Sequence, residues 1–427
     1  MAYHLTRRDL LRIAGTATLA TAAAPLATAC GSGAPKSDTD GDAFTVYWNA
    51  GHGYQAYEKV IDEFEREHGV TVNFQKYQWP DLRTRLLADL ASGTVPDVVE
   101  TQGAWVQEFA VSGDALSLAK YVAADGAEMG FPDDWLPATV SRNSHEGEVY
   151  GLQLHYTCSL LLYNRTMLDA AGISPPSTWD DLLAAAKELT TGEVYGIALN
   201  QDSSYAWPWL VQNGVRFYDP DTRAVLAPRE AAEEALRFQA DLAHRHRVSP
   251  VPVPSTDYAG PQKLLSAGRA AMIITGPWDL KPIADTSPDL ELGIAPVLRQ
   301  KEQATISAGA SMMVPAKASR PDLSWDFLRR ITTLDVERAA TREAGMLMPR
   351  KSWAEQPEVQ DDEHIRAFAD GLPHARDFLE EIGPTGRSGE IADNLFKTLY
   401  QSIVVANTPV SEAFAVFDEA AGRALAG

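Results

Sequence analysis

Residues 44–53 read Phe-Thr-Val-Tyr-Trp-Asn-Ala-Gly-His-Gly, a β-branched and aromatic run that meets a glycine-rich turn. This composition predicts a strand that ends near Asn49. Residues 54–68 then place apolar side chains at helical spacing, and Gly69 follows them, as a glycine often follows the last turn of a helix. The stretch therefore predicts a strand, a turn and a helix in that order.

The same alternation continues beyond Gly69. Residues 70–74 alternate like a strand, residues 80–90 carry a leucine-rich helical face, and residues 97–101 form a third apolar strand. Strand, helix, strand, helix, strand predicts an α/β lobe with a largely parallel sheet. A repeat of fixed period is absent from the sequence, which argues against solenoids and propellers.

Further elements are predicted along the rest of the chain. A helix through Leu189 has Ser177 or Thr178 as a plausible N-cap residue. Strands are expected at 149–154, 160–163, 195–199 and 270–275, and helices at 229–246, 323–334 and 335–345. The last part, roughly 361–427, has a mostly helical pattern.

The N-terminus carries the pattern of an export signal. Arg7-Arg8 is followed by a weakly apolar stretch that is too short and too polar for a membrane span. Ala27-Thr28-Ala29-Cys30 resembles the lipobox of bacterial lipoproteins. We therefore expect residues 1–29 to be a twin-arginine lipoprotein signal peptide, lipidation of Cys30, and a flexible tether over 30–42. The alternative is an ordinary signal peptide with an incidental cysteine. The lipid would anchor the protein to the outer face of the cell membrane, in an extracytoplasmic location.

Composition limits the possible partners. The chain has 427 residues, 45% of them hydrophobic, and a net charge of −21. Removal of residues 1–29, which carry three arginines and one aspartate, would leave a charge near −23. Such a charge argues against nucleic acid and anionic lipid surfaces as partners. If Cys30 is lipidated, Cys158 has no disulfide partner, and its apolar neighbours predict a buried small hydrophobe.

Motifs of catalysis are missing from the sequence. It contains no G-x-x-x-x-G-K-[ST] loop, no G-x-S-x-G elbow and no H-E-x-x-H helix. The tract 244–247, His-Arg-His-Arg, is interpreted as a solvated helix end, because its arginines repel cations. Acidic pairs are interpreted as surface solvation rather than as a glycosidase dyad. We expect no cofactor, no metal and no enzymatic activity, and binding is favoured.

Several segments resemble extracellular solute-binding proteins of the maltose-binding type. Residues 90–99 are similar to the family's "asG-x-x-PDvv" signature, and Gln153 stands where the family usually has proline. The other similar segments are 44–49, 147–152, 162–165, 171–182, 268–278 and 309–311. They occur in the family's order from residue 44 to about 311. The last hundred residues resemble it only in helical character and in the ending at 408–414.

The resemblance implies a periplasmic-binding-protein-like fold, with two α/β lobes joined by hinge strands and a ligand cleft between them. The chain is expected to cross between lobes near His155, near 293–297 and between Pro321 and Pro349. The lobes would comprise 43–155 plus about 297–345, and 156–293 plus about 350–427. The resemblance also implies a monomer that delivers solute to the membrane permease of an ABC importer.

Candidate ligand-binding residues follow from the position of strand ends. In open α/β sheets, ligands lie beyond the carboxyl ends of strands. The resemblance adds Gly309 and Ser311, and a predicted loop adds Arg350. The strand ends select Asn49, His52, Thr101, Gln102, Trp105, Tyr156, Asp202, Tyr205, Trp207 and Trp278.

These residue types suit a sugar. Aromatic rings cover the C–H faces of a pyranose, and Asn, Gln, Asp and His bond its hydroxyls. We therefore expect capture of a di- or oligosaccharide. Alternatives are a secreted carbohydrate hydrolase, and a binding protein for glycerophosphodiesters or for amino sugars, where Asp202 would pair with an amine. Trp207 has the alternative of packing its own loop, Arg350 that of facing solvent, and Trp48 is predicted to be core.

Overall fold

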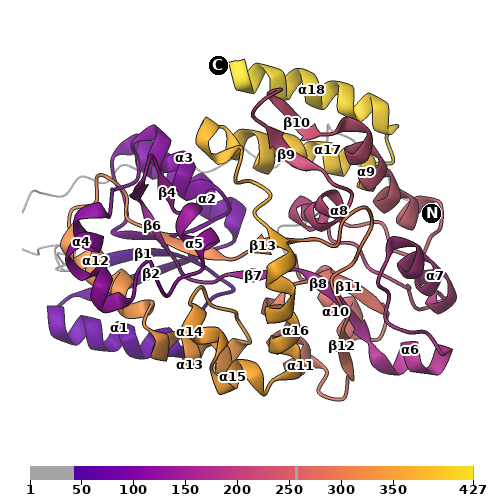
Figure 1. The fold of residues 1–427 in the computed structure, drawn as a ribbon, viewed down its shortest axis with the longest axis horizontal. Coiled ribbons are helices and arrows are strands. Elements are labelled where there is room, and N and C mark those ends of the chain that lie inside the picture. The colour runs from indigo at the N-terminus through magenta and orange to yellow at the C-terminus, as the bar shows by residue number, and fades with distance from the viewer. Residues whose placement is uncertain (1–42, 255–257, 427) are drawn as a thin grey trace, which may run out of the picture. The chain divides into compact units, whose positions relative to one another are not determined.

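The strand predicted at the start of the fold is β1, Ala43–Asn49. The computed structural model describes residues 43–254 and 258–426. The signal peptide and the tether predicted for residues 1–42, with Cys30 between them, lie outside the described residues. Figure 1 shows the arrangement of the helices and strands.

A five-stranded sheet, here called the first sheet, is built around β1 in the order β2-β1-β3-β14-β6. Its strands β1, β2 and β3 are parallel, which confirms the prediction of a largely parallel sheet. Strand β14 is antiparallel to both β3 and β6. The bounds are Thr71–Tyr77 for β2, Val98–Gln102 for β3, Gly151–Gln153 for β6 and Ala310–Met313 for β14.

The helices around the first sheet bury one apolar face each. Helix α1 buries Tyr57, Val60 and Phe64, and it ends at Gly69, whose φ of 65° lies in the left-handed region. Most of these helices follow in the chain order that the sequence predicts. They are α1 Gln55–His68, α2 Trp79–Ser92, α3 Trp105–Ser112, α4 Ala119–Met129, α5 Pro137–Ser141, α12 Pro321–Ile331 and α13 Leu334–Ala344.

A three-stranded sheet, here called the second sheet, has the order β11-β8-β12, and both outer strands are antiparallel to β8. Its strands are β8 Leu160–Asn164, β11 Met272–Thr275 and β12 Leu292–Ile294. The prediction of a strand at 195–199 is wrong, because these residues form no regular strand in the structure. Tyr195 and Ala198 make only isolated bridges to the β11 region, because the N–H of Ile197 turns to Val248 instead.

Among the helices near the second sheet, α7 begins at a side-chain cap. Thr178, one of the two N-cap residues that the sequence predicts, caps α7, and its side chain and that of Asp181 form a reciprocal capping box. The elements are α6 Arg165–Ala171, α7 Trp179–Leu189, η2 Ser203–Ala206, α8 Trp207–Gln212, α9 Arg229–His244, α10 Gly260–Ser266, η3 Pro277–Asp279 and α11 Leu280–Thr286, with the hairpin β9 Arg216–Asp219 and β10 Ala224–Ala227.

A third sheet, here called the bridging sheet, joins the first two. Its order is β15-β13-β7, with β7 Thr157–Cys158, β13 Thr305–Ala308 and β15 Ala375–Arg376. Strand β7 lies between β6 and β8 in the chain, and β13 lies between β12 and β14. Figure 1 shows β7 and β13 running between the two larger sheets.

Gly293 pairs with Tyr163 inside the second sheet, and the chain next enters the bridging sheet at β13. It enters the bridging sheet again at β15, after α14 Lys351–Ala354, α15 Pro357–Gln360 and α16 Glu363–Gly371. The crossings expected near 293–297 and between Pro321 and Pro349 stay predictions. Beyond β15 the chain is helical: η6 Gly389–Phe396, α17 Lys397–Tyr400, η7 Gln401–Val405 and α18 Val410–Ala426.

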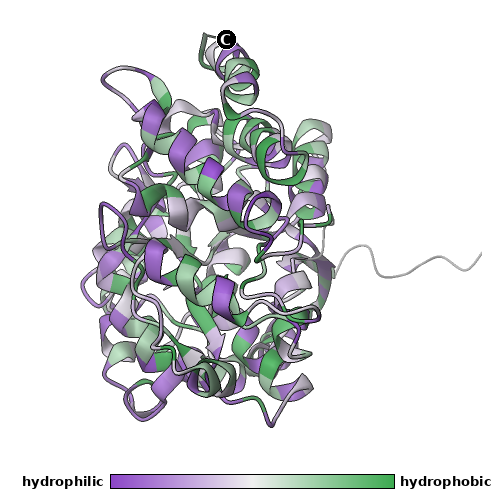
Figure 2. Cartoon of the chain, turned by 90° about the vertical axis from the view of Figure 1, so that its right-hand side faces the viewer, coloured by the Kyte–Doolittle hydropathy of each residue, from purple (hydrophilic) through white to green (hydrophobic). Residues whose placement is uncertain are grey.

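The core follows the alternation of β1. Phe44, Val46 and Trp48 are fully buried in one cluster with α1 and α12, whereas Tyr47 points to the other face and packs with Leu82 of α2. Trp48 is therefore a core residue, as predicted. Figure 2 shows hydrophilic and hydrophobic residues alternating along the helices. In the two described ranges, no helix combines the length and the apolar composition of a membrane span.

Cys158 is fully buried on β7 and forms no disulfide within the described chain. Burial raises the pKa of its thiol well above the ordinary value. The prediction that Cys158 is a buried small hydrophobe is confirmed.

Candidate functional site

Strand β1 ends at Asn49, and the loop that follows carries His52 to the carboxylate of Glu100 on β3. The backbone N–H of Asn49 donates a hydrogen bond of 2.6 Å to Oε2 of Glu100, and Nδ1 of His52 contacts Oε1. Glu100 is fully buried, and His52 is 8% exposed. The structure thus brings the predicted pair Asn49 and His52 together. Glu100 was missed, because its position inside a strand pattern carries no functional signal.

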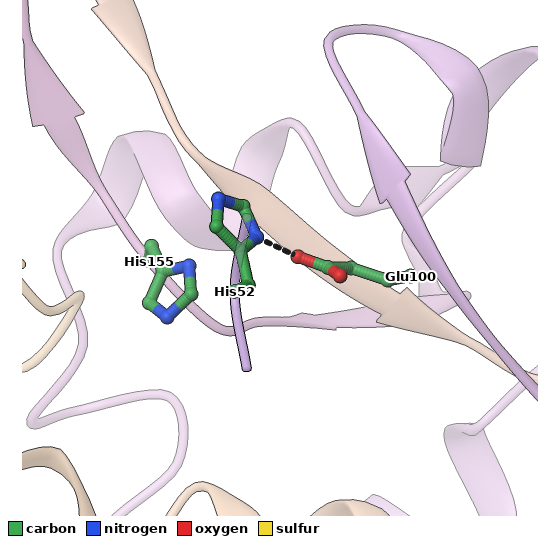
Figure 3. A group of neighbouring side chains, drawn as sticks. All are labelled: His52, Glu100 and His155. Atoms are coloured by element: carbon green, nitrogen blue, oxygen red, sulfur yellow. Dashed lines mark hydrogen bonds and ion pairs between the residues drawn. The ribbon is translucent and has the colours of Figure 1, made fainter. Parts of the chain in front are cut away.

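His155 joins this group from the segment that leads into β7. Its Nε2 lies 2.9 Å from the hydroxyl of Tyr57, and its ring lies nearly perpendicular to that of His52 at a centroid distance of 4.9 Å. Burial, together with the neighbouring His52, lowers the pKa of His155 well below its ordinary value. His52, Glu100 and His155, here called the buried triad, lie side by side in Figure 3.

The end of β3 contributes three predicted residues with different surroundings. Thr101 is buried, and its hydroxyl donates a hydrogen bond of 3.2 Å to the carbonyl of Ser311. Gln102, the last residue of β3, is half-buried and pairs with Ala310. Trp105 begins α3, and its Nε1 donates a hydrogen bond of 3.2 Å to Oδ2 of Asp393. Trp105 thereby joins α3 to the C-terminal helix η6.

Asp393 on η6 interacts with Arg83 of α2 and with Trp105 of α3. Nε of Arg83 lies 3.4 Å from Oδ2 of Asp393, and its guanidinium lies 5.0 Å from the ring centre of Trp105. Burial raises the pKa of Asp393 to about 6, although Arg83 and the bond from Trp105 act in the other direction. The carboxylates of Glu108 and Asp202 raise that pKa further. Asp393 was missed because the sequence around it indicates only a helix.

Tyr205 and Trp278 form an aromatic pair near the carboxyl end of β11. Nε1 of Trp278 donates a hydrogen bond of 3.1 Å to the hydroxyl of Tyr205, and the two rings are almost perpendicular at 89°. Trp278 also lies over Gly276, where a Cβ would come within 2.2 Å of its ring. Both side chains are partly exposed. The structure thus brings these two predicted residues together.

Asp202 and Trp207 flank the aromatic pair. Asp202 caps η2 and accepts a hydrogen bond of 2.9 Å from the N–H of Ser204. Trp207 packs against Phe378, which follows β15, at a ring distance of 5.8 Å, and its buried Nε1 has no hydrogen-bond partner in the part of the chain that the structure describes. Ligand contact by Trp207 stays a prediction.

Electrostatic influence relates the aromatic pair to Tyr258 near the β1 loop, and relates Asp202 to Asp393. A Cβ on Gly51 would lie 3.0 Å from the hydroxyl of Tyr258. Burial raises the pKa of Tyr205, and the neighbouring Tyr258 raises it further. The charge of Asp202 acts on Asp393. We define the candidate site as Arg83, Trp105, Asp202, Tyr205, Tyr258, Trp278 and Asp393.

Four predicted residues lie outside the candidate site, namely Tyr156, Ser311, Gly309 and Arg350. Tyr156 is buried beneath the guanidinium of Arg142, beside a separate cavity of about 350 Å³. Ser311 is buried and donates a hydrogen bond of 3.1 Å to Oε1 of Gln153. Gly309 has a φ of 129°, and a Cβ there would lie 2.0 Å from the carbonyl oxygen of His155.

Arg350 is bound inside the protein and does not face solvent. Nη1 donates to the carbonyl of Met129 at 2.7 Å, and Nη2 donates to that of Thr332 at 2.6 Å. Nε lies 3.3 Å from Oε1 of Glu337, a carboxylate that is 2% exposed. The structure therefore does not bring Arg350 to the candidate site, because its donors already bind helix-end carbonyls and a buried acid.

Comparisons with known proteins agree with this arrangement. The sequence model of the family described as "Bacterial extracellular solute-binding protein" matches residues 49–336. A binding protein of Brucella abortus is 25% identical over 356 residues, which cover 81% of this chain and 84% of that protein. The arabinooligosaccharide-binding protein of Bacillus subtilis is 24% identical over 309 residues, covering 68% and 70%.

A solved structure shares the fold. An ABC transporter solute-binding protein from Thermotoga lettingae, bound with α-D-tagatose, superposes with a TM-score of 0.80 at 23% identity. The match covers 90% of this chain and 100% of that one.

Proposed function

Because the chain belongs to the bacterial extracellular solute-binding proteins, we propose that it is the substrate-binding component of an ABC importer and that its solute is a carbohydrate. Two groups of contacts carry the proposal: Asp393 with Trp105 and Arg83, and Tyr205 with Trp278. Aromatic faces cover the C–H surfaces of a pyranose, and the charged groups bond its hydroxyls.

The proposed solute is a di- or oligosaccharide. The Bacillus subtilis relative is an arabinooligosaccharide-binding protein, and the Thermotoga lettingae structure holds a sugar. The partly exposed pair Tyr205 and Trp278 would cover one face of a sugar ring, whereas Trp105, which is buried, would support the carboxylate of Asp393 as a hydrogen-bond acceptor. The protein would bind the sugar without altering it.

We propose that sugar binding closes two lobes by bending at the bridging sheet. The first lobe would comprise 43–155 with 309–371, and the second 156–304 with 377–426. Ser307 pairs with Cys158 and Thr305 with Ala375, so neighbouring crossings share backbone hydrogen bonds. Such a ladder can twist while its bonds persist, which suits hinge closure.

We further propose that the protein is exported by the twin-arginine signal, anchored through lipidated Cys30 and active as a monomer beside its permease. Mass spectrometry of membrane-associated protein would detect an acylated Cys30 at the mature N-terminus. A Cys30→Ser variant is expected in the soluble extracellular fraction. A mature chain that begins elsewhere without a lipid would refute the anchor.

The sugar proposal is tested by calorimetry and thermal unfolding with a panel of ligands. Arabino- and malto-oligosaccharides, monosaccharides, amino sugars and glycerophosphocholine would be titrated into the purified soluble domain. We expect a saturable signal and a raised Tm with one oligosaccharide class, because a ligand of the native state stabilises it by mass action. Recovery of the sugar unchanged by chromatography excludes hydrolysis. Binding confined to glycerophosphocholine or to amino sugars, or release of smaller glycans, would overturn the proposal.

A further inference from the structure

The side chains of the buried triad are of the types that commonly bind metal ions. His52, Glu100 and His155 each offer one ligand atom, and these atoms all lie within 4.8 Å of one another. They come from the β1–α1 loop, from β3 and from the segment before β7, so their meeting is a product of the fold. Two imidazoles and one carboxylate are a common ligand set for zinc and other first-row divalent metals.

The charge balance of Glu100 favours a cation at this place. The carboxylate is fully buried, and within the described ranges its one ion pair is with His52. A buried carboxylate is costly unless a positive charge or several hydrogen bonds compensate it. Oε2 is satisfied by the N–H of Asn49, which leaves Oε1 to the imidazole.

The orientation of His155 supplies a second, independent observation. Nε2 is held by the hydroxyl of Tyr57, whereas the fully buried Nδ1 has no hydrogen-bond partner among residues 43–254 and 258–426. In Figure 3 this unpartnered nitrogen is on the side of the ring that faces His52. Metal-bound histidines typically ligate through one nitrogen while a second group holds the other, and Tyr57 is placed for that holding role.

We propose that His52, Glu100 and His155 bind one divalent transition-metal ion, with Zn²⁺ as the best match to the ligand set. Small shifts of the two imidazoles and the carboxylate would bring their atoms to the usual distances of about 2.0–2.2 Å from zinc. The ion would tie the β1–α1 loop and β3 to the first crossing. It would thereby stiffen one side of the proposed hinge.

The test uses zinc chloride and the full mature chain after dialysis against a chelator. Calorimetry, and metal analysis after gel filtration, are expected to give one zinc per chain, and zinc should raise the Tm. His155→Asn and Glu100→Gln should each weaken zinc binding at least tenfold. His145→Asn is the matched control, because His145 lies on the surface hairpin strand β4, Ser144–His145, outside the triad. It should bind zinc like the unaltered protein.

Three outcomes would overturn the proposal. The first is no zinc binding by the unaltered protein, which would leave the triad as a His–Glu ion pair. The second is equal zinc binding by His155→Asn and the unaltered protein, which would indicate adventitious surface binding. The third is loss of zinc in His145→Asn. Circular dichroism identifies any variant that fails to fold, and the other triad variant then decides. All measurements are made without sugar, so they are independent of the proposed transport function.

Discussion

The indole nitrogen of Trp105 donates a hydrogen bond of 3.2 Å to Oδ2 of Asp393, joining α3 to the C-terminal helix η6. The two residues are 288 positions apart in the sequence. The bond holds a titratable carboxyl beside a tryptophan face and the Arg83 guanidinium. Because the pKa of Asp393 is raised, the protonation of this candidate-site residue affects the free energy of unfolding of the whole protein.

Replacing Asp393 by Asn is expected to stabilise the protein at neutral pH. The pKa of Asp393 is about 6 in the folded chain, against an ordinary value of 3.8. The group therefore contributes most stability below pH 3.8, and that contribution is lost as the pH rises through 6. Asp393→Asn should raise the free energy of unfolding by about 1–3 kcal/mol at pH 7.5.

Urea unfolding at a series of pH values checks this expectation. The difference between Asp393→Asn and the unaltered protein should shrink as the pH falls below 3.8, where both side chains are neutral. A difference that is constant with pH would contradict the role assigned to the carboxyl. The same variant should bind sugar more weakly, because it lacks the charged acceptor.

Replacing Trp278 by Ala should weaken sugar binding more than tenfold, which corresponds to about 1.4 kcal/mol. The variant loses the stacking face and leaves the hydroxyl of Tyr205 without its 3.1 Å partner. Trp278→Phe keeps a ring and serves as the control, with a smaller loss. Calorimetry measures both affinities, and thermal unfolding verifies the fold. Unchanged affinity in Trp278→Ala would remove this residue from the site.

Replacing Arg350 by Met should lower the free energy of unfolding by about 3–5 kcal/mol and leave the sugar affinity unchanged. The substitution isolates Glu337, whose pKa is already raised well above its ordinary value by burial, against the opposing charge of Arg350. Arg423→Met, which removes only an exposed pair with Glu419, should change stability by less than about 0.5 kcal/mol. If the Arg350→Met variant folds but binds sugar more weakly than the unaltered protein, Arg350 contributes to ligand binding after all.

Replacing Gly309 by Ala should destabilise the protein by more than about 3 kcal/mol or prevent folding. The residue has a φ of 129°, and an added Cβ would lie 2.0 Å from the carbonyl oxygen of His155. Gly422→Ala is the control, because no atom lies within 4 Å of its Cβ position in α18. It should gain about 0.5–1 kcal/mol. Equal stabilities in chemical unfolding would refute the assigned constraint.

The helices and strands around the first sheet are mostly predictable from the sequence, because local patterns of apolar residues and glycines mark where they begin and end. Helices α1 and α2 end at Gly69 and Gly93, both with positive φ, and strand alternation predicts which side chains of β1 are buried. The sequence predicts Tyr205 and Trp278 singly as ligand-binding residues, because each follows a strand-like segment, and their contact with each other is a finding of the structure. Local patterns do not indicate which distant strands pair, so the pairing of β13 with β7 and β15 could not be predicted.

The residues missed have a common physical cause. Glu100 lies inside a strand, His155 lies between two strands, and Asp393 lies in a helix. Each local pattern is that of ordinary structure. Their chemistry arises from tertiary contacts that bring distant segments together, and neither periodicity nor motif spacing encodes such contacts. Arg350 is the opposite case, because the sequence around it predicts an exposed loop that could reach the ligand. In the structure its guanidinium donates hydrogen bonds to carbonyl groups inside the protein.

The close approach of Gly309 to His155 has an evolutionary consequence. Substitutions in the segments that carry Asp202 and Trp278 would alter which solute is captured, and the partly exposed side chains there have room to vary. At Gly309 any side chain would strike the opposing backbone. A lineage adapting to a new nutrient would therefore diversify its loops while this pivot stayed fixed, so recognition can evolve separately from movement.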